Sequence, residues 1–197
     1  MKKLKGFSLK AIAAMLVCLA LVLTGCGEAP KASESTGAEK PRVQINMADG
    51  GVILVELEPD VAPATVANFL KLVDKGFYDG LTFHRVIPGF MIQGGDPLGT
   101  GTGDSGETVK GEFSANGVDN TIAHKRGTLS MARSKSYDSA SCQFFITNAD
   151  APHLDGQYAA FGRVLEGMDV VDRITAVATD SNDKPLVPVV ISSVRRV

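Results

Sequence analysis

Short stretches of alternating apolar and polar residues follow one another along most of the chain. Two of them lie between residues 43 and 57, on either side of an Asp-Gly-Gly tripeptide at positions 49–51. The first stretch places Val43, Ile45 and Met47 on one face, and the second has the same two-residue period. This period is typical of strands, and a glycine-rich tripeptide suits a tight turn, so the pattern predicts a hairpin.

Residues 62–75 have a helical spacing instead. Their apolar side chains recur at i, i+3, i+4 and i+7, namely Val66, Phe69, Leu70 and Val73. Pro63 suits the first turn of a helix, and Gly76 suits its C-terminal cap. We therefore predict one amphipathic helix with its apolar face on the core. A second, shorter helix is predicted over residues 168–175.

Further short apolar segments are separated by glycine-rich turns. They cover residues 82–87, 90–93, 128–132, 144–147, 160–164 and 189–194. Together with the hairpin, this spacing is typical of an antiparallel barrel or sandwich, because closure or face-to-face packing protects the sheet edges. A domain of about 150 residues buries enough surface to fold without disulfides.

The beginning of the chain has the layout of a secretory signal. Four lysines precede an uncharged, mostly apolar stretch over residues 11–23, which is shorter than the roughly 20 residues that span a bilayer. The stretch ends in LTGC, which resembles the lipobox of bacterial lipoproteins. This resemblance implies that the signal is cleaved and that Cys26 carries lipid. An ordinary signal peptide with a chance cysteine, or an uncleaved anchor, are the alternatives.

The sequence thus divides into three parts. Residues 1–25 are the predicted lipoprotein signal peptide, and residues 26–41 are the lipidated cysteine with a flexible linker that has no large apolar residue. Residues 42–197 form the folded domain, and we expect it to be extracytoplasmic and tethered to the cell membrane by the lipid on Cys26.

Charge and motif spacing exclude several kinds of function. The net charge of −2 includes four lysines of the signal, so the rest of the chain is more acidic, and nucleic acid is not expected as a partner. The GxGxxG pattern at 101–106 lacks the flanking strand and helix of a nucleotide site, which favours a tight loop. His84, His124 and His153 are too scattered for a metal site. Cys142 is interpreted as a small buried residue in a strand.

The segment FHRVIPGFMIQGGD at residues 83–96 is the most unusual stretch of the chain. It resembles the cyclophilin family, and the likeness continues through LSMA at 129–132, SCQFFI at 141–146 and LDGQYAAFG at 154–162. With the hairpin and the first helix it extends from about residue 43 to residue 194. The resemblance implies a mainly β fold, an eight-stranded antiparallel closed barrel capped by two α-helices, with the active site on its outer face.

The resemblance also implies an activity and a set of site residues. The activity is peptidyl-prolyl cis-trans isomerisation, with Arg85, Phe90 and Gln93 as the catalytic residues. The residues expected to bind the substrate are Met91, Gly101, Ala132, Arg133, Gln143, Phe145, His153, Leu154 and Tyr158. At Arg133, His153 and Tyr158 the sequence departs from the best-known eukaryotic members, all on the rim of the pocket.

The residue types suit this reaction. Resonance gives the bond before proline a rotational barrier of about 18–20 kcal/mol, and a rigid, charged guanidinium can donate to the proline nitrogen as the bond twists. No metal or cofactor is expected. The expected partners are proline-containing segments of exported proteins, and the expected state is a monomer. The alternatives are a proline-binding chaperone module without essential catalysis, and a surface lipoprotein that uses other faces of the barrel.

Overall fold

The computed structural model describes residues 39–197 of the chain. The predicted signal peptide, Cys26 and all but the end of the linker therefore lie outside the described residues. Within the described part, no helix is both long and apolar enough to span a bilayer.

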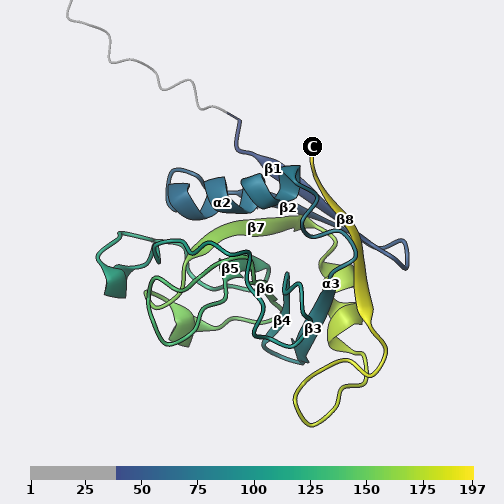
Figure 1. Ribbon diagram of the computed structural model, residues 1–197. Coiled ribbons are helices and arrows are strands. Elements are labelled where there is room, and N and C mark those ends of the chain that lie inside the picture. Colours follow the sequence, from purple (N-terminus) through teal and green to yellow (C-terminus); the bar gives the residue numbers. More distant parts are fainter. Residues whose placement is uncertain (1–38) are drawn as a thin grey trace, which may run out of the picture. The chain divides into compact units, whose positions relative to one another are not determined.

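Eight strands in this part of the chain close into a barrel in which every neighbouring pair is antiparallel (Figure 1). The strand order around the barrel is β1-β2-β7-β5-β6-β4-β3-β8. The strands are β1 (Arg42–Met47), β2 (Val52–Leu57), β3 (Thr82–Ile87), β4 (Met91–Gly94), β5 (Thr128–Met131), β6 (Phe144–Thr147), β7 (Ala160–Glu166) and β8 (Val189–Arg196). The expected eight-stranded closed barrel is confirmed.

The predicted hairpin is formed by β1 and β2. Val43 pairs with Val55 and Ile45 pairs with Ile53, and all four side chains are fully buried. The turn uses Gly50 with a positive φ of 87°, a conformation that favours glycine. The alternation of the sequence therefore matches the inner and outer faces of the barrel wall at this hairpin.

The first predicted helix is α2 (Pro63–Asp74), which lies along one side of the barrel, and the second is α3 (Met168–Thr175) on another (Figure 1). Pro63 occupies the first turn of α2 as expected. At the other end, Gly76 has a φ of 64°, and the N–H groups of Gly76 and Phe77 donate to the carbonyls of Val73 and Leu72. These two bonds satisfy carbonyls that the end of a helix leaves without partners.

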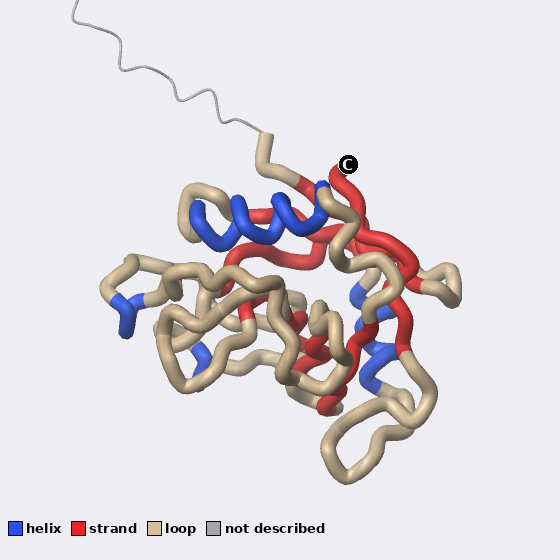
Figure 2. Tube along the Cα trace, viewed as in Figure 1, coloured by secondary structure: helices blue, strands red, loops and turns tan. Residues whose placement is uncertain are grey.

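Loops make up much of the chain below α2 in the view of Figure 2, where they are drawn in tan. Two of them contain short 3-10 helices that the sequence pattern did not predict, η1 (Ser114–Asn116) and η2 (Pro152–Leu154). Both are only three residues long, too short to show a helical period.

The barrel core contains a cluster of aromatic side chains among its aliphatic ones. Phe69 of α2 is fully buried, and its ring centroid lies 5.2 Å from that of Tyr78, 5.6 Å from that of Phe144 and 5.2 Å from that of Phe161. Aromatic pairs at such distances add to the stabilisation that burial alone provides. This cluster joins α2 to β6 and β7.

Cys142 is buried, as expected, but it precedes β6 and does not lie in a strand. Burial raises the pKa of its thiol to about 11, so the thiol stays protonated at neutral pH. Its backbone carbonyl accepts a hydrogen bond of 3.1 Å from the hydroxyl of Tyr78. The side chain therefore serves the core and is not an activated nucleophile.

Candidate active site

Strands β3, β4 and β6 lie side by side and present one set of side chains inward and another outward. Ile92, Phe144 and Ile146 point into the core and are fully buried. The other set includes Gln93 of β4, which pairs with Arg85 of β3 on one side and with Phe145 of β6 on the other. Because side chains alternate along a strand, this register gathers the predicted site residues on the outer face of the barrel.

The outer face carries a pocket of about 220 Å³. It is lined by Arg85, Phe90, Met91, Gln93, Ala132, Arg133, Phe145, Leu154 and Tyr158. Every one of these residues belongs to the site predicted from the sequence. The volume is below the roughly 300–1,000 Å³ of pockets that hold drug-sized ligands, so the pocket suits a single side chain.

The floor of the pocket is apolar. Met91, Phe145 and Leu154 form a cluster with Ala151 that is separate from the barrel core, and each of them is at most 7% exposed. Phe90, Ala132 and Tyr158 pack against this cluster at its edge. The floor therefore offers a desolvated socket to an apolar ring.

His124 supports Phe145 from behind. The two rings are stacked with centroids 6.1 Å apart, and the imidazole is held by Asp155 at 2.9 Å from Nδ1 and by Ser130 at 3.0 Å from Nε2. Burial lowers the pKa of His124, although the Asp155 carboxylate opposes this shift. A ring fixed at both nitrogens leaves the floor little freedom to deform.

Arg85 stands at the wall of the pocket with 44% of its side chain exposed. Its Nε atom lies 3.4 Å from Oδ2 of Asp183, which belongs to the loop before β8. Its two terminal nitrogens make no hydrogen bond to the described residues. The terminal donors are therefore available to a bound molecule.

Gln93 and Gln143 form a chain of hydrogen bonds beside the pocket. Nε2 of Gln93 donates to Oε1 of Gln143 at 2.9 Å, and Nε2 of Gln143 donates to the carbonyls of Gly101 and Gly103 at 3.1 and 2.8 Å. These bonds assign the orientation of both amides. They also tie β4 to the glycine-rich loop.

The glycine-rich loop is organised around the buried carboxylate of Asp96. This carboxylate accepts hydrogen bonds from the N–H groups of Leu98, Thr100 and Gly101 at 2.8, 2.9 and 2.5 Å. Gly101 has a φ of 87°, which confirms the expected tight loop with a positive backbone angle. Burial acts to raise the pKa of Asp96, but the N–H donors outweigh it and hold the pKa below its ordinary value.

This arrangement predicts an acid-sensitive loop. A carboxyl whose pKa is lowered by folding stabilises the protein above its ordinary pKa of 3.8, and that contribution is lost as the pH falls through the lowered value. We expect Asp96→Asn to reduce the free energy of unfolding at pH 7 by about 1.5–3 kcal/mol, the range for hydrogen bonds to a charged group. Denaturant unfolding at pH 7 and pH 3 should show the gap between the two proteins narrowing at pH 3.

The exposed Asp104 of the same loop provides a control, because Asp104→Asn should change stability by no more than about 0.5 kcal/mol. A gap between Asp96→Asn and the parent that is equally wide at both pH values would contradict the role given to the Asp96 carboxylate.

Arg133 is fixed above the pocket by three aromatic rings. Its guanidinium carbon lies 5.2 Å from the ring centroid of Phe113, 5.0 Å from that of Tyr137 and 4.6 Å from that of Tyr158. The group also donates to the carbonyls of Gln157 and Ser134. The charge is therefore held in place at the rim.

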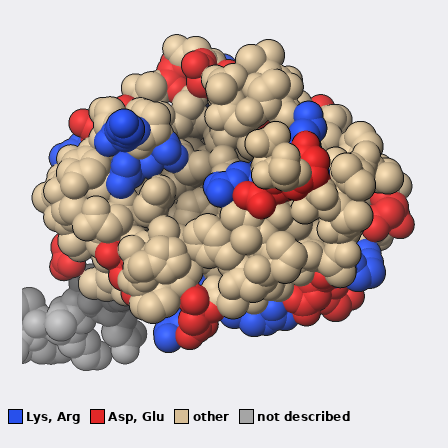
Figure 3. Space-filling model, turned by 90° about the horizontal axis from the view of Figure 1, so that it is seen from below, with Lys and Arg blue, Asp and Glu red and all other residues tan. Residues whose placement is uncertain are grey.

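A second hollow of about 470 Å³ adjoins the first and shares Gln93, Ala132 and Arg133 with it. Gly101 and Gln143 line this hollow and not the apolar pocket. Seen from below, the surface is hollowed near its centre, with basic atoms on two sides of the hollow (Figure 3). The two pockets are continuous through these shared residues and together form a groove on the outer face of the barrel.

His153 is the predicted site residue that lines neither pocket. Its ring packs against Phe90 with centroids 5.4 Å apart. The position is on η2, directly before Leu154 of the pocket floor. His153 therefore stands behind the rim and contacts the groove through Phe90.

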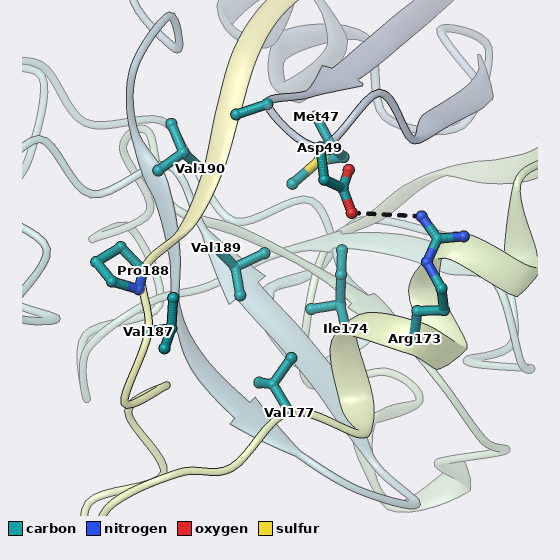
Figure 4. Close-up of a pocket in the computed structure, with 10 residues that line it drawn as sticks. Met47, Asp49, Arg173, Ile174, Val177, Val187, Pro188, Val189 and Val190 are labelled. Atoms are coloured by element: carbon teal, nitrogen blue, oxygen red, sulfur yellow. Dashed lines mark hydrogen bonds and ion pairs between the residues drawn. The ribbon is translucent and has the colours of Figure 1, made fainter.

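Another pocket, of about 360 Å³, lies between α3, β8 and the β1–β2 turn (Figure 4). Its polar groups are the ion pair of Asp49 and Arg173, 3.4 Å apart, and its other walls include Ile174, Val177 and Val189. Asp49 and Arg173 point toward each other, and Ile174, Val177 and Val189 lie below them in this view (Figure 4). None of the predicted site residues lies there.

Three residues of the site escaped the sequence analysis. Asp183 contacts Arg85, Asp96 organises the glycine-rich loop, and His124 supports Phe145. Asp96 could have been found from its place directly before the glycine-rich stretch, where turn-forming aspartates are common. The other two gave no signal, because they reach the site through contacts between distant parts of the chain.

By their geometry alone, residues 39–197 form a small closed barrel with a groove on its outer face. Comparison with known proteins narrows this class. Residues 42–196 match the family described as cyclophilin type peptidyl-prolyl cis-trans isomerase/CLD. The chain therefore belongs to the cyclophilin family, and it is a peptidyl-prolyl cis-trans isomerase.

Individual relatives agree with this assignment. Peptidyl-prolyl cis-trans isomerase B of Bacillus subtilis is 52% identical over 121 residues, which cover 61% of this chain and 81% of that protein. Peptidyl-prolyl cis-trans isomerase-like 2 of Gibberella zeae is 42% identical over 166 residues, 84% of this chain but only 27% of that longer protein. A cyclophilin type isomerase from Cryptosporidium parvum superposes with a TM-score of 0.74 at 32% identity, covering 80% of this chain and 98% of that chain.

Proposed function

We propose that Arg85 is the residue that accelerates rotation about the X-Pro bond. Twisting removes amide resonance and leaves a lone pair on the proline nitrogen that can accept a hydrogen bond. Arg85 lines the pocket, and its terminal nitrogens make no hydrogen bond to residues 39–197. A donor that gains strength only as the bond twists stabilises the transition state more than the ground state, and this difference lowers the barrier.

In this proposal the apolar socket holds the proline ring while the chain before it rotates. Met91, Phe145 and Leu154 supply a buried, rigid floor of the size of one side chain. The second hollow, with Gln93 and Gln143 at its edge, takes peptide on one side of the ring. Fixing one end of the bond matters because free rotation of the whole peptide would not twist it.

The observation that carries this assignment is the register of β3, β4 and β6. It places a cationic donor, an amide and an aromatic floor next to one another on one outer face, from Arg85, Gln93 and Phe145. The isomerase assay of an Arg85→Ala variant, developed in the Discussion, tests it.

We also propose that the enzyme acts outside the cytoplasm on exported proteins, tethered through a lipid on Cys26. The proposal rests on the sequence LTGC after a short apolar stretch, and on a following segment without large apolar residues. X-Pro isomerisation takes tens to hundreds of seconds without a catalyst, so exported chains that fold near the membrane would benefit from an isomerase held there.

Membrane fractionation tests the tether. We expect the full chain to sediment with membranes and to partition into detergent, whereas Cys26→Ala should lose the lipid and fail to be processed at that position. Cys18→Ala is the matched control, since Cys18 lies within the apolar stretch and is not predicted to carry lipid. Equal membrane association of the parent and the Cys26→Ala variant, with no lipid detected by mass spectrometry, would contradict the proposal.

A further inference from the structure

Asp183 has a left-handed backbone conformation. It is the one non-glycine residue with a positive φ among residues 39–197, at 64°. This region of backbone space favours glycine, and among residues with a side chain, aspartate and asparagine enter it most often.

The side chain of Asp183 contacts the guanidinium of Arg85. Oδ2 of Asp183 lies 3.4 Å from Nε of Arg85, and both side chains are roughly equally exposed, at 43% and 44%. The two residues are 98 positions apart in the chain. Nothing in the local sequence of either residue requires them to meet.

The backbone around Asp183 is tied to β3 directly beside Arg85. The carbonyl of Asp183 accepts a hydrogen bond of 2.8 Å from the N–H of Val86, and its own N–H donates to the carbonyl of Asp180 at 3.1 Å. The carboxylate of Asp180 accepts from the N–H groups of Asn182 and Lys184, which closes the loop on itself. The carboxylate of Asp183 is therefore carried by a braced loop.

Only the Nε atom of the Arg85 guanidinium contacts Asp183. The two terminal nitrogens of Arg85, which lines the pocket, keep no hydrogen-bond partner among residues 39–197. An unpaired arginine side chain samples many rotamers, and holding it at Nε restricts that freedom without occupying the donors proposed to act on the substrate.

We infer that Asp183 is a positioning residue that orients Arg85 for the isomerisation. The inference rests on the role proposed for Arg85. It concerns the pre-organisation of a donor, so its effect belongs in kcat and not in the binding of the peptide.

The test compares three variants of Asp183 in the full chain with an uncharged, blocked proline peptide. Asp183→Asn keeps a residue that tolerates positive φ but removes the charge, and Asp183→Gly removes both the charge and the backbone strain. Both should lower kcat about three- to fivefold, equivalent to about 0.6–1 kcal/mol, with KM little changed and without loss of thermal stability. Asp183→Glu should recover part of kcat.

The dependence of kcat on ionic strength distinguishes the positioning of Arg85 from a purely structural role of Asp183. The pair is exposed, so raising the ionic strength should bring the kcat of the parent down toward that of Asp183→Asn and leave the variant unchanged. The matched control is Asp49→Asn, which removes the carboxylate of an exposed aspartate–arginine pair at the same distance of 3.4 Å but remote from the groove. This control should leave kcat at the parent value.

Arg85→Ala measured in parallel separates the two claims. If Arg85→Ala is impaired and adding Asp183→Asn to it lowers kcat no further, Asp183 acts through Arg85. If Arg85→Ala is impaired but Asp183→Asn keeps the parent kcat, the inference about Asp183 is wrong and the role of Arg85 stands. If Arg85→Ala keeps full activity, the proposed function of Arg85 itself is wrong.

Discussion

Replacing Arg85 with alanine should lower kcat/KM for a proline peptide at least tenfold, with KM close to that of the parent. Tenfold corresponds to about 1.4 kcal/mol of transition-state stabilisation, and removal of a single pre-organised donor in other enzymes costs about 10²–10³-fold. The effect should fall on kcat because the donor gains its partner only as the bond twists. A protease-free assay of cis-to-trans conversion measures both constants.

The stability of the Arg85→Ala variant should stay within about 0.5 kcal/mol of the parent, because the side chain is 44% exposed and forms a single surface ion pair. Arg85→Lys is the informative companion. It keeps the charge but replaces the rigid fork by one ammonium, so we expect it to recover only part of the lost rate. Full recovery by lysine would mean that charge alone is sufficient.

Phe144 and Phe145 are neighbours on β6, and truncating them should affect different properties. Truncation of Phe144 should lower stability, and truncation of Phe145 should weaken substrate binding. The ring of Phe144 lies in the barrel core against Phe69, Tyr78 and Phe83. Phe145 faces outward and forms the pocket floor. Phe144→Ala should reduce the free energy of unfolding by about 3–5 kcal/mol, the usual cost of a large cavity in a core.

Phe145→Ala should act mainly on the substrate. Loss of the apolar floor removes contact area worth about 1.5–3 kcal/mol for a buried side chain, so kcat/KM should fall about 10- to 100-fold, chiefly through KM. Denaturant unfolding and isomerase kinetics of both variants check the pair. Because a loss of that size is a large fraction of the stability of an ordinary domain, Phe144→Leu serves as a milder substitution at the same site. A Phe145→Ala variant with the parent KM would contradict the position of the proline ring.

The strands could be predicted well from the sequence, because each one carries its own alternating pattern. Thr82–Ile87 and Phe144–Thr147 were found with their observed bounds, and Met168–Thr175 was found as a helix. The order of the strands in the barrel could not be predicted in this way, because β2 pairs with β7 and β3 pairs with β8 across long stretches of chain. Alternation does not record such partners, and only the resemblance to the family supplied the closed barrel.

The site residues divide in the same way, into those predicted from a local motif and those that depend on distant contacts. Arg85, Phe90 and Gln93 lie within one short motif and were named from it, and the structure gathers them at one pocket. The supporting residues Asp183 and His124 were missed, because their roles depend on a loop folded back onto β3 and on a ring packed behind β6. Local sequence patterns carry no information about contacts of that kind.

The role of Arg85 is tested most sharply by the rate of isomerisation of a peptide that is already bound, measured by NMR exchange spectroscopy on the full chain at matched saturation. We expect Arg85→Ala to bind the proline peptide as tightly as the parent but to interconvert the bound cis and trans forms at least ten times more slowly. Equal on-enzyme rates in the parent and the variant would show that the groove works without Arg85 and would contradict the central claim.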